Sequence, residues 1–598
     1  MKSPSGLRAI IQKNIKIKRI SEIYDLSRYL CFLFPFIICL SCRDDFLEVK
    51  PAGTLNEYTL ADEKGIEALL IGAYSMLDGL SANAGGWESA SSNWLYGSVR
   101  GVEANKGSDA GDSNYDITLI QNFSDTNWPG YSSFYLNKKW TAVYEAVSRC
   151  NSVIRVVKRA QEDGSITASQ AELFMKQART LRGWYHFEAW RMWQKIPFVD
   201  ENTFLNEATN KEDVRQKIID DLAEGISLPD DMGAVGRFNR TVSEVLLAKA
   251  LMQMNHDYAR ALDLLKSASE GTNPAGEPVG LASTCGEIFN IENRNCTEAV
   301  YTVQTSVNDG SGGLNGGYGE ALNFPYSGSS PAGCCGFFQP TQEFVNSFRT
   351  SGGLPLPDFS YNSDPVKNDQ GLSSEDPFTE DQGTLDPRLD WSVGRRGIPY
   401  WDWGEHAGDD WIRDQNYAGP YSPKKQVYLK SQENIYTEAG NWTTGFTANG
   451  YRMIRYADVL LLIAECQIET GDLPGALENI NLVRARAANP EGFVKEADGI
   501  TNAANYSITT YSSFPDKEYA LKALYMERKL ELGQEGHRWF DLNRWGITVS
   551  ELNRALAYEK SMPWGYMYNN AIVGPEDTTF LIPQHQIDLS NGNLVQNR

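Results

Sequence analysis

Apolar residues along much of this chain recur every three to four positions, the spacing that places them on one face of an α-helix. Helices are predicted over residues 136–159, 169–193, 211–228, 241–254, 257–267, 455–470 and 473–487. An earlier helix is expected to begin at Thr59, a candidate N-cap with Asp62 in the capping-box position, and to bury Ile66 and Leu70. The fold class predicted from these patterns is mainly α.

Two of the predicted stretches are helix pairs joined by a short turn. The first combines 241–254 with 257–267, and the second combines 455–470 with 473–487 around Gly471. Small residues in these helices allow close approach, as in tetratricopeptide repeats. The spacing between the pairs is irregular, so unrelated α-hairpins are the alternative. We expect a tetratricopeptide-like helical repeat scaffold with a large loop-rich insertion.

Residues 270–449 supply that insertion. They are dense in Gly, Pro, Asn, Asp and aromatic residues, and only 342–349 has a helical pattern. Loop-rich regions of this length in a folded protein are usually functional. We therefore divide the chain into a helical part over 58–269, a ligand-binding region over 270–449 and a C-terminal helical part over 450–598. All three are expected to pack as one globular body.

The N-terminal segment has the features of a lipoprotein signal peptide over residues 1–41. A basic stretch precedes an apolar run over 29–40, which is too short to span a bilayer as a helix. Ser41 is the small residue that lipoprotein signal peptidase needs before the modified cysteine. Cys42 is thus predicted to carry lipid, and 42–57 to form a lipid-anchored linker. An ordinary cysteine in a secretory signal is the alternative.

The charge balance narrows the range of partners. The chain has 55 Lys and Arg against 77 Asp and Glu, a net charge of −22. Phosphate backbones are bound by clustered basic side chains, so nucleic acid is excluded as an expected partner.

Cysteine spacing indicates no zinc site. Cys285 and Cys296 are the most plausible disulfide pair, whereas the adjacent Cys334 and Cys335 are expected to be free or packed rather than joined. Calcium is possible because the insertion holds several acids, but no ligand spacing supports it. No cofactor is predicted beyond the lipid on Cys42.

Aromatic residues make up 11% of the chain, and several lie in segments without helical periodicity. Sugar rings present flat CH faces that stack on aromatic rings, while their hydroxyls need polar side chains at the ring edges. The predicted ligand-binding residues are Trp94, Tyr96, Trp128, Tyr400, Trp401, Asp402, Trp403, Trp411 and Arg413. Packing in the core is the alternative for any single ring, and exposed aromatics also serve protein interfaces.

Residues 527–546, ERKLELGQEGHRWFDLNRWG, crowd acids, bases and aromatics together. The segment lacks the HExxH spacing of a metalloprotease, and the chain has no nucleophile elbow, P-loop or Rossmann fingerprint. Opposite charges lie three residues apart in Arg528–Glu531, Arg538–Asp541 and Asp541–Arg544. We interpret the segment as a packed, salt-bridged scaffold, and we expect the protein not to be an enzyme.

The same segment resembles the C-terminal signature of the SusD/RagB family of outer-membrane nutrient-binding lipoproteins, roughly ER-x-x-E-L-x-x-E-G-x-R-W-x-D-L-x-R-W-G. The resemblance extends over the tether, the helix pairs, the insertion and the closing FLIPQHQIDLSNGNLVQN. It implies a SusD-like fold, in which a helical repeat scaffold carries an elaborated loop region. Asp44 and Asp45 look like the signal that exports Bacteroidetes lipoproteins to the cell surface.

The resemblance also implies a function in nutrient uptake and polysaccharide utilisation. Such a protein is anchored in the cell outer membrane, faces the exterior, and captures a glycan or another nutrient oligomer. It passes the ligand to a SusC-like TonB-dependent transporter, over which it moves like a hinged lid. A surface glycoside hydrolase and a protein- or peptide-binding module of the same fold are the alternatives.

Overall fold

The structure, a computed structural model, describes residues 57, 59–82, 86–112, 114–124, 134–204 and 207–598. Residues Glu57–Arg598 form one compact unit. The predicted signal peptide, Cys42 and Trp128 lie outside the described residues. Within those residues, no helix has both the length and the apolar character needed to cross a membrane.

The first described helices confirm the expected periodicity, with one correction. Helix α2 (Glu63–Tyr74) begins later than predicted, because Asp62 rather than Thr59 is its N-cap. The Asp62 carboxylate accepts a hydrogen bond from the Gly65 backbone N–H over 2.8 Å. Helices α4 (Phe134–Glu162) and α5 (Ala168–Trp193) follow and pack along each other, with α2 against both.

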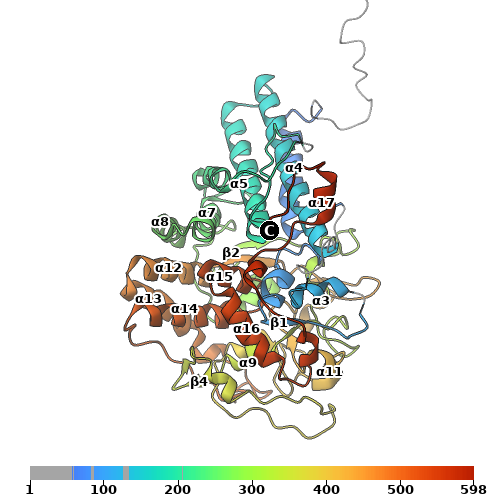
Figure 1. The fold of residues 1–598 in the computed structure, drawn as a ribbon, viewed down its shortest axis with the longest axis vertical. Helices are drawn as coiled ribbons and strands as arrows, with labels where there is room; N and C mark the ends of the chain where they lie inside the picture. The colour runs from blue at the N-terminus through green and yellow to red at the C-terminus, as the bar shows by residue number, and fades with distance from the viewer. Residues whose placement is uncertain (1–56, 58, 83–85, 113, 125–133, 205–206) are drawn as a thin grey trace, which may run out of the picture. The chain divides into compact units, whose positions relative to one another are not determined.

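The two predicted helix pairs form one stack, although they are far apart in the sequence (Figure 1). Helix α7 (Arg240–Asn255) packs on α8 (Tyr258–Ser269), and α12 (Tyr456–Thr470) packs on α13 (Leu473–Ala487). Contacts between α8 and α12 join the pairs, and α14 (Lys517–Leu532) packs against α12. The helical repeat scaffold is thereby confirmed.

Shorter helices complete the scaffold, some of them without a periodic signal. Between α5 and α7 lies α6 (Arg215–Ala223), and α15 (Arg538–Trp545), α16 (Thr548–Glu559) and α17 (Gln584–Leu589) follow α14. A π-helix over Trp94–Val99 and α3 (Tyr115–Gln121) occupy an interval in which no period was found. All residues of the π-helix are buried, so no polar face marks it in the sequence.

Strand pairs hold the loop-rich region to the scaffold. Strand β1 (Ala104–Gly107) pairs with β3 (Phe337–Pro340), and β2 (Ala299–Val303) pairs with β10 (Tyr451–Arg455), both antiparallel. The remaining strands and α-helices of this region are β4 (Thr350–Ser351), β5 (Leu354–Pro355), β6 (Val393–Gly394), β7 (Ser422–Pro423), β8 (Thr437–Glu438), β9 (Phe446–Thr447), α9 (Gln342–Asn346), α10 (Leu389–Ser392) and α11 (Gln415–Ala418).

The cysteine predictions are wrong on both counts. Cys334 and Cys335 form a disulfide with each other, whereas the thiols of Cys285 and Cys296 are free. Cys285 lies close enough to the Arg486 guanidinium for that charge to act on its pKa, while Cys296 packs against an apolar cluster around Phe289. Nearness in sequence therefore did not bring the two thiols together. Among the residues described, no group of three or more His, Cys, Asp or Glu could hold a metal ion.

The charged segment over 527–546 is a buried structural network, but most of its predicted ion pairs are wrong. Only Asp541–Arg544 forms as expected, at 2.8 Å. Arg528 pairs with Asp458 and Asp541, each at 2.8 Å, rather than with Glu531. Arg538 pairs with Glu551 at 3.0 Å rather than with Asp541. The partners come from other helices because these side chains face the interior of the scaffold.

Glu531 is the centre of this network. Its carboxylate accepts hydrogen bonds from Arg455, Arg486 and Arg388 at 2.9, 2.5 and 3.3 Å. Burial alone would raise the pKa of Glu531, but the three guanidinium groups outweigh burial and hold that pKa well below its usual range. The carboxylate is consequently a fixed structural anion rather than a proton donor.

Candidate ligand-binding site

Four aromatic rings contact one another at the surface of the loop-rich region. Trp87 stacks on Tyr318 with ring centroids 5.0 Å apart, and Tyr318 stacks on Phe446 at 5.5 Å. Trp442 meets Trp87 and Phe446 edge-on, at 6.1 and 5.7 Å. Phe446 is buried, Trp87 and Tyr318 are half-buried, and Trp442 is 40% exposed. We call these four rings the aromatic ledge.

Glycine-rich turns position the ledge. Tyr318 opens a short 3₁₀ helix directly after Gly317, and Trp442 lies in the connection between β8 and β9. A Cβ atom at Gly313 or Gly440 would lie 2.4 or 2.2 Å from the Phe446 ring. Only glycine at these two positions lets both loops close onto the ring. The ledge is consequently braced by packing and does not depend on one flexible side chain.

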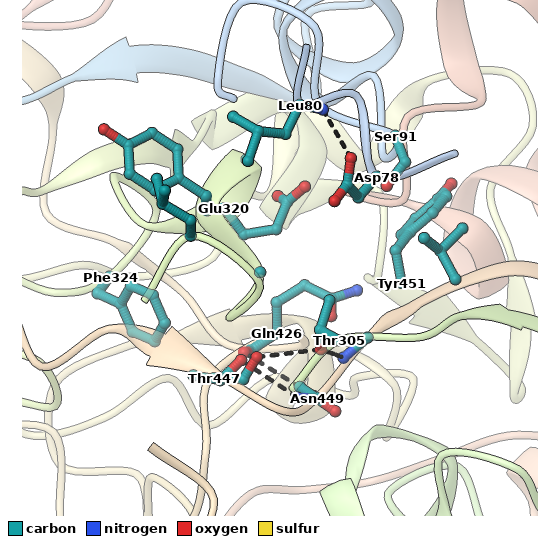
Figure 2. Close-up of a pocket in the computed structure, with 16 residues that line it drawn as sticks. Asp78, Leu80, Ser91, Thr305, Glu320, Phe324, Gln426, Thr447, Asn449 and Tyr451 are labelled. Atoms are coloured by element: carbon teal, nitrogen blue, oxygen red, sulfur yellow. Dashed lines mark hydrogen bonds between the residues drawn. The ribbon is translucent and has the colours of Figure 1, made fainter. Parts of the chain in front are cut away.

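A small pocket adjoins the ledge and shares Tyr318 with it. Figure 2 shows Gln426, Thr305 and Asn449 along one side of this pocket. The Thr305 hydroxyl donates to the Thr447 carbonyl over 3.0 Å and accepts from the Gly450 N–H over 2.9 Å. The Asn449 side-chain amide likewise donates to the Gln426 carbonyl over 3.3 Å, so these hydrogen bonds hold polar groups in place beside an aromatic surface.

Two acids, Asp78 and Glu320, point into the pocket from the side opposite Gln426 (Figure 2). Burial raises the pKa of Asp78 to about 7. Two smaller effects lower this pKa: the Leu80 N–H donates to the carboxylate over 2.7 Å, and the positive charge of Arg149 lies nearby. Burial likewise raises the pKa of Glu320 to about 7, against a hydrogen bond from Asn323. Both acids therefore change charge near neutral pH.

The first group of predicted ligand-binding rings is buried in the scaffold. Trp94 and Tyr96 are each 1% exposed, within the π-helix. The Tyr96 hydroxyl donates to the Glu88 carbonyl over 2.7 Å, and the Trp94 ring meets Phe338 edge-on. These two rings have no face that a sugar could reach, so we correct their assignment to core residues. Trp87, from the same loop interval, is the ring that joins the ledge.

Much of the second group is also structural. Tyr400 is 0% exposed and Trp411 is 4% exposed, so their assignment is corrected in the same way. The Asp402 carboxylate accepts from the backbone N–H groups of Lys430 and Ser431 at 2.5 and 2.9 Å, and thereby caps a 3₁₀ helix. Arg413 is paired with Asp109 at 2.7 Å.

Trp401 and Trp403 remain half-buried, and their indole N–H groups donate to the carbonyls of Lys424 and Tyr428 at 3.2 and 3.0 Å. Ligand contact by Trp401, Asp402, Trp403 and Arg413 stays a prediction, since each keeps some exposed surface.

Tyr318, Trp442 and Phe446 were missed by reasoning from the sequence. Each stands alone between Gly, Asn and Thr residues, as in NGGYGEA and GNWTTGF, and not in a dense aromatic run. The signal that could have found them is an isolated aromatic residue flanked by glycine, because such segments form turns that expose a ring.

Comparisons with known proteins agree with this architecture. Residues 297–598 match the family model described as "SusD family", and residues 45–251 match one described as "Starch-binding associating with outer membrane". A SusD-like protein of Bacteroides ovatus is 22% identical over 301 residues, which are 47% of this chain and 50% of that protein. This match thus spans half the length of that relative. SusD-like protein P25 of Formosa agariphila is 21% identical over 88% of this chain and 90% of its own length.

The fold is also similar to solved structures. One is surface glycan-binding protein A from Bacteroides thetaiotaomicron in complex with laminarihexaose. It matches with a TM-score of 0.60 and 21% identity, over 90% of this chain and 99% of that one. Because the SusD family model alone covers half of the sequence and its relatives share the helical scaffold, this chain belongs to the SusD family.

Proposed function

We propose that this protein binds a glycan, or another nutrient oligomer, on the aromatic ledge and in the adjoining pocket. The observation that carries the proposal is the ledge itself, in which Trp442 is 40% exposed while three other rings brace it. Exposed, preorganised aromatic surface is costly to leave in water and is typical of ligand sites. The polar pocket wall beside it, which includes the Gln426 amide, suits sugar hydroxyls.

The relatives support the same ligand class. The solved structure of surface glycan-binding protein A holds laminarihexaose, a neutral sugar oligomer, on a similar fold. The family model that matches residues 45–251 carries starch binding and outer-membrane association in its description. We propose that this chain likewise works at the outer membrane, anchored through lipid on Cys42 and facing the exterior.

Delivery is the second part of the proposal. The family resemblance implies a SusC-like TonB-dependent transporter as the partner, over which this protein opens and closes like a lid. The ligand captured on the ledge would then enter the barrel intact, and we propose that the protein is not an enzyme. Pull-down of the transporter from outer membranes with the lipidated protein as bait tests this part. Loss of co-purification on Cys42→Ala, with the fold retained, is the expected result.

A surface glycoside hydrolase is the one alternative that a specific observation favours, because Asp78 and Glu320 both point into the pocket. Hydrolases of this kind use two carboxyl groups on either side of the scissile bond. Incubation with the polysaccharide that binds most strongly distinguishes the two functions. Release of shorter sugars that stops in Glu320→Gln would establish hydrolysis and contradict the binding-only proposal.

The ledge is tested by Trp442→Ala, measured by affinity electrophoresis against a panel of polysaccharides. Loss of one stacking ring should weaken binding about tenfold, as expected from an aromatic contact of about 1.4 kcal/mol. Trp403→Ala is the comparison variant, since it removes a half-buried indole from the other aromatic loop, where ligand contact was also predicted. Binding that falls with Trp403→Ala but survives Trp442→Ala would move the site away from the ledge.

A further inference from the structure

We infer that the pocket beside the aromatic ledge selects neutral or amino-substituted glycans and rejects glycans that carry sulfate or carboxylate groups. This inference deepens the proposed function and rests on it. It concerns which chemical class of sugar the pocket accepts.

The charges on the pocket wall carry the argument. Of the described residues that line the pocket, the ionisable acids are Asp78 and Glu320, and none is Lys, Arg or His. The phenols of Tyr318 and Tyr451 also line it, and burial raises the pKa of both, so they stay neutral. Any charge that the wall itself presents to a ligand is consequently negative.

Basic side chains close to the pocket are already engaged. Lys425 precedes the lining residue Gln426, but it is 4% exposed and its ammonium pairs with Glu535 at 2.7 Å. Arg452 follows the lining residues 449–451, but it is 2% exposed and donates to the Asn449 carbonyl over 2.9 Å. Neither cation is available to a ligand anion.

The surroundings of the two acids also leave their charge uncompensated. Among the residues that the structure describes, Arg149 is the base that acts on Asp78, and it is itself paired with Glu145 at 2.6 Å. Around Glu320 the groups that act on the carboxyl are the neutral Ser92 and Asn323. Sulfate and carboxylate ligands are normally held by Arg or Lys side chains, and the described residues that line the pocket include neither. A sugar hydroxyl or ammonium can instead donate to either acid.

The selectivity should depend on pH. Burial raises the pKa of Asp78 and of Glu320 to about 7. Both carboxyls are largely neutral at pH 5.5 and largely ionised at pH 8.5. Repulsion of an anionic glycan is therefore expected to be stronger at pH 8.5, where an ionised wall faces it.

The test begins with affinity electrophoresis against laminarin, starch, xyloglucan, galactomannan, chitosan, alginate, carrageenan and heparin. The strongest ligand should be neutral or amino-substituted. Its carboxymethylated form should bind about tenfold more weakly at pH 8.5, with a smaller difference at pH 5.5. The inference would be overturned if the strongest ligand were anionic and its binding were lost in Trp442→Ala. The proposed function would still stand in that case. Binding to no member of the panel would instead overturn the proposed function, and this inference with it.

The double variant Asp78→Asn and Glu320→Gln locates the effect. The quantity to compare is the affinity for the carboxymethylated glycan divided by the affinity for the unmodified glycan. In the double variant this ratio should be about tenfold higher than in the wild type at pH 8.5, and it should no longer depend on pH. The control is Asp263→Asn with Glu478→Gln, which removes the same charge from exposed positions on α8 and α13. An equal change in control and test variants would show that net charge, rather than the pocket wall, sets the selectivity.

Discussion

At the scale of single residues, Asp78 and Glu320 are the unusual groups of the pocket, because burial disfavours their charged forms. Their pKa in the folded protein, about 7, is above the ordinary values of 3.8 and 4.5. The folded state therefore holds these protons more tightly than the unfolded state does. It follows that the free energy of unfolding contributed by the two acids falls as the pH rises from about 4 to about 7.

This linkage predicts that the Asp78→Asn, Glu320→Gln double variant is more stable than the wild type at pH 8.5. The expected gain in the free energy of unfolding is about 1–2 kcal/mol. This is less than the full difference between the folded and unfolded pKa values would give, because both side chains are partly exposed to solvent. The gain should largely vanish at pH 4.5, where the wild-type acids are neutral in the folded state. Urea unfolding at both pH values measures it, and a gain independent of pH would contradict the account.

At the scale of elements, the segment that carries the family signature is a hub that ties helices together. Helix α14 supplies Glu531, whose partners Arg455 and Arg486 belong to the end of β10 and to α13. Removing one partner from a buried ion cluster leaves the others charged and unpaired in a poorly solvated site. The network therefore fixes how these elements are arranged, whichever ligand the loops bind.

Glu531→Ala is accordingly expected to lower the free energy of unfolding by about 3–5 kcal/mol. Glu518→Ala is the control on the same helix, because Glu518 is largely exposed and pairs with Lys522 one turn away. That variant should cost about 0.5 kcal/mol or less. Urea unfolding followed by circular dichroism compares the two. Similar midpoints would mean that the buried cluster does not stabilise the scaffold as described.

The helices could be predicted from sequence because their apolar stripes have a 3.6-residue period that each helix carries within itself. The pairing of α12 with α13 followed from such local signals. Most of the ion pairs could not be predicted, because spacing within one helix gave Asp541–Arg544 but does not reveal partners such as Asp458 on another helix. The same limit explains why Trp94 and Tyr400, conspicuous in the sequence, lie in the core.

At the scale of the whole described unit, the candidate site is built from segments far apart in the sequence. Asp78 and Trp87 come from the N-terminal helical part, Tyr318 from the start of the insertion and Trp442 from its end. The antiparallel pairing of β2 with β10 sets Val303 opposite Tyr451 and so brings two walls of the pocket together. No local sequence signal reports this convergence, which is why the ledge was missed.

The central claim is that ligand binds on this ledge. The measurement that tests it most directly is a crystal structure of the protein with an oligosaccharide of the polysaccharide that binds most strongly. We predict a sugar ring within about 4 Å of the Trp442 and Tyr318 rings, with hydroxyls reaching Gln426 or Asn449 in the pocket. An oligosaccharide seated instead over Trp401 and Trp403, with the ledge empty, would contradict the account.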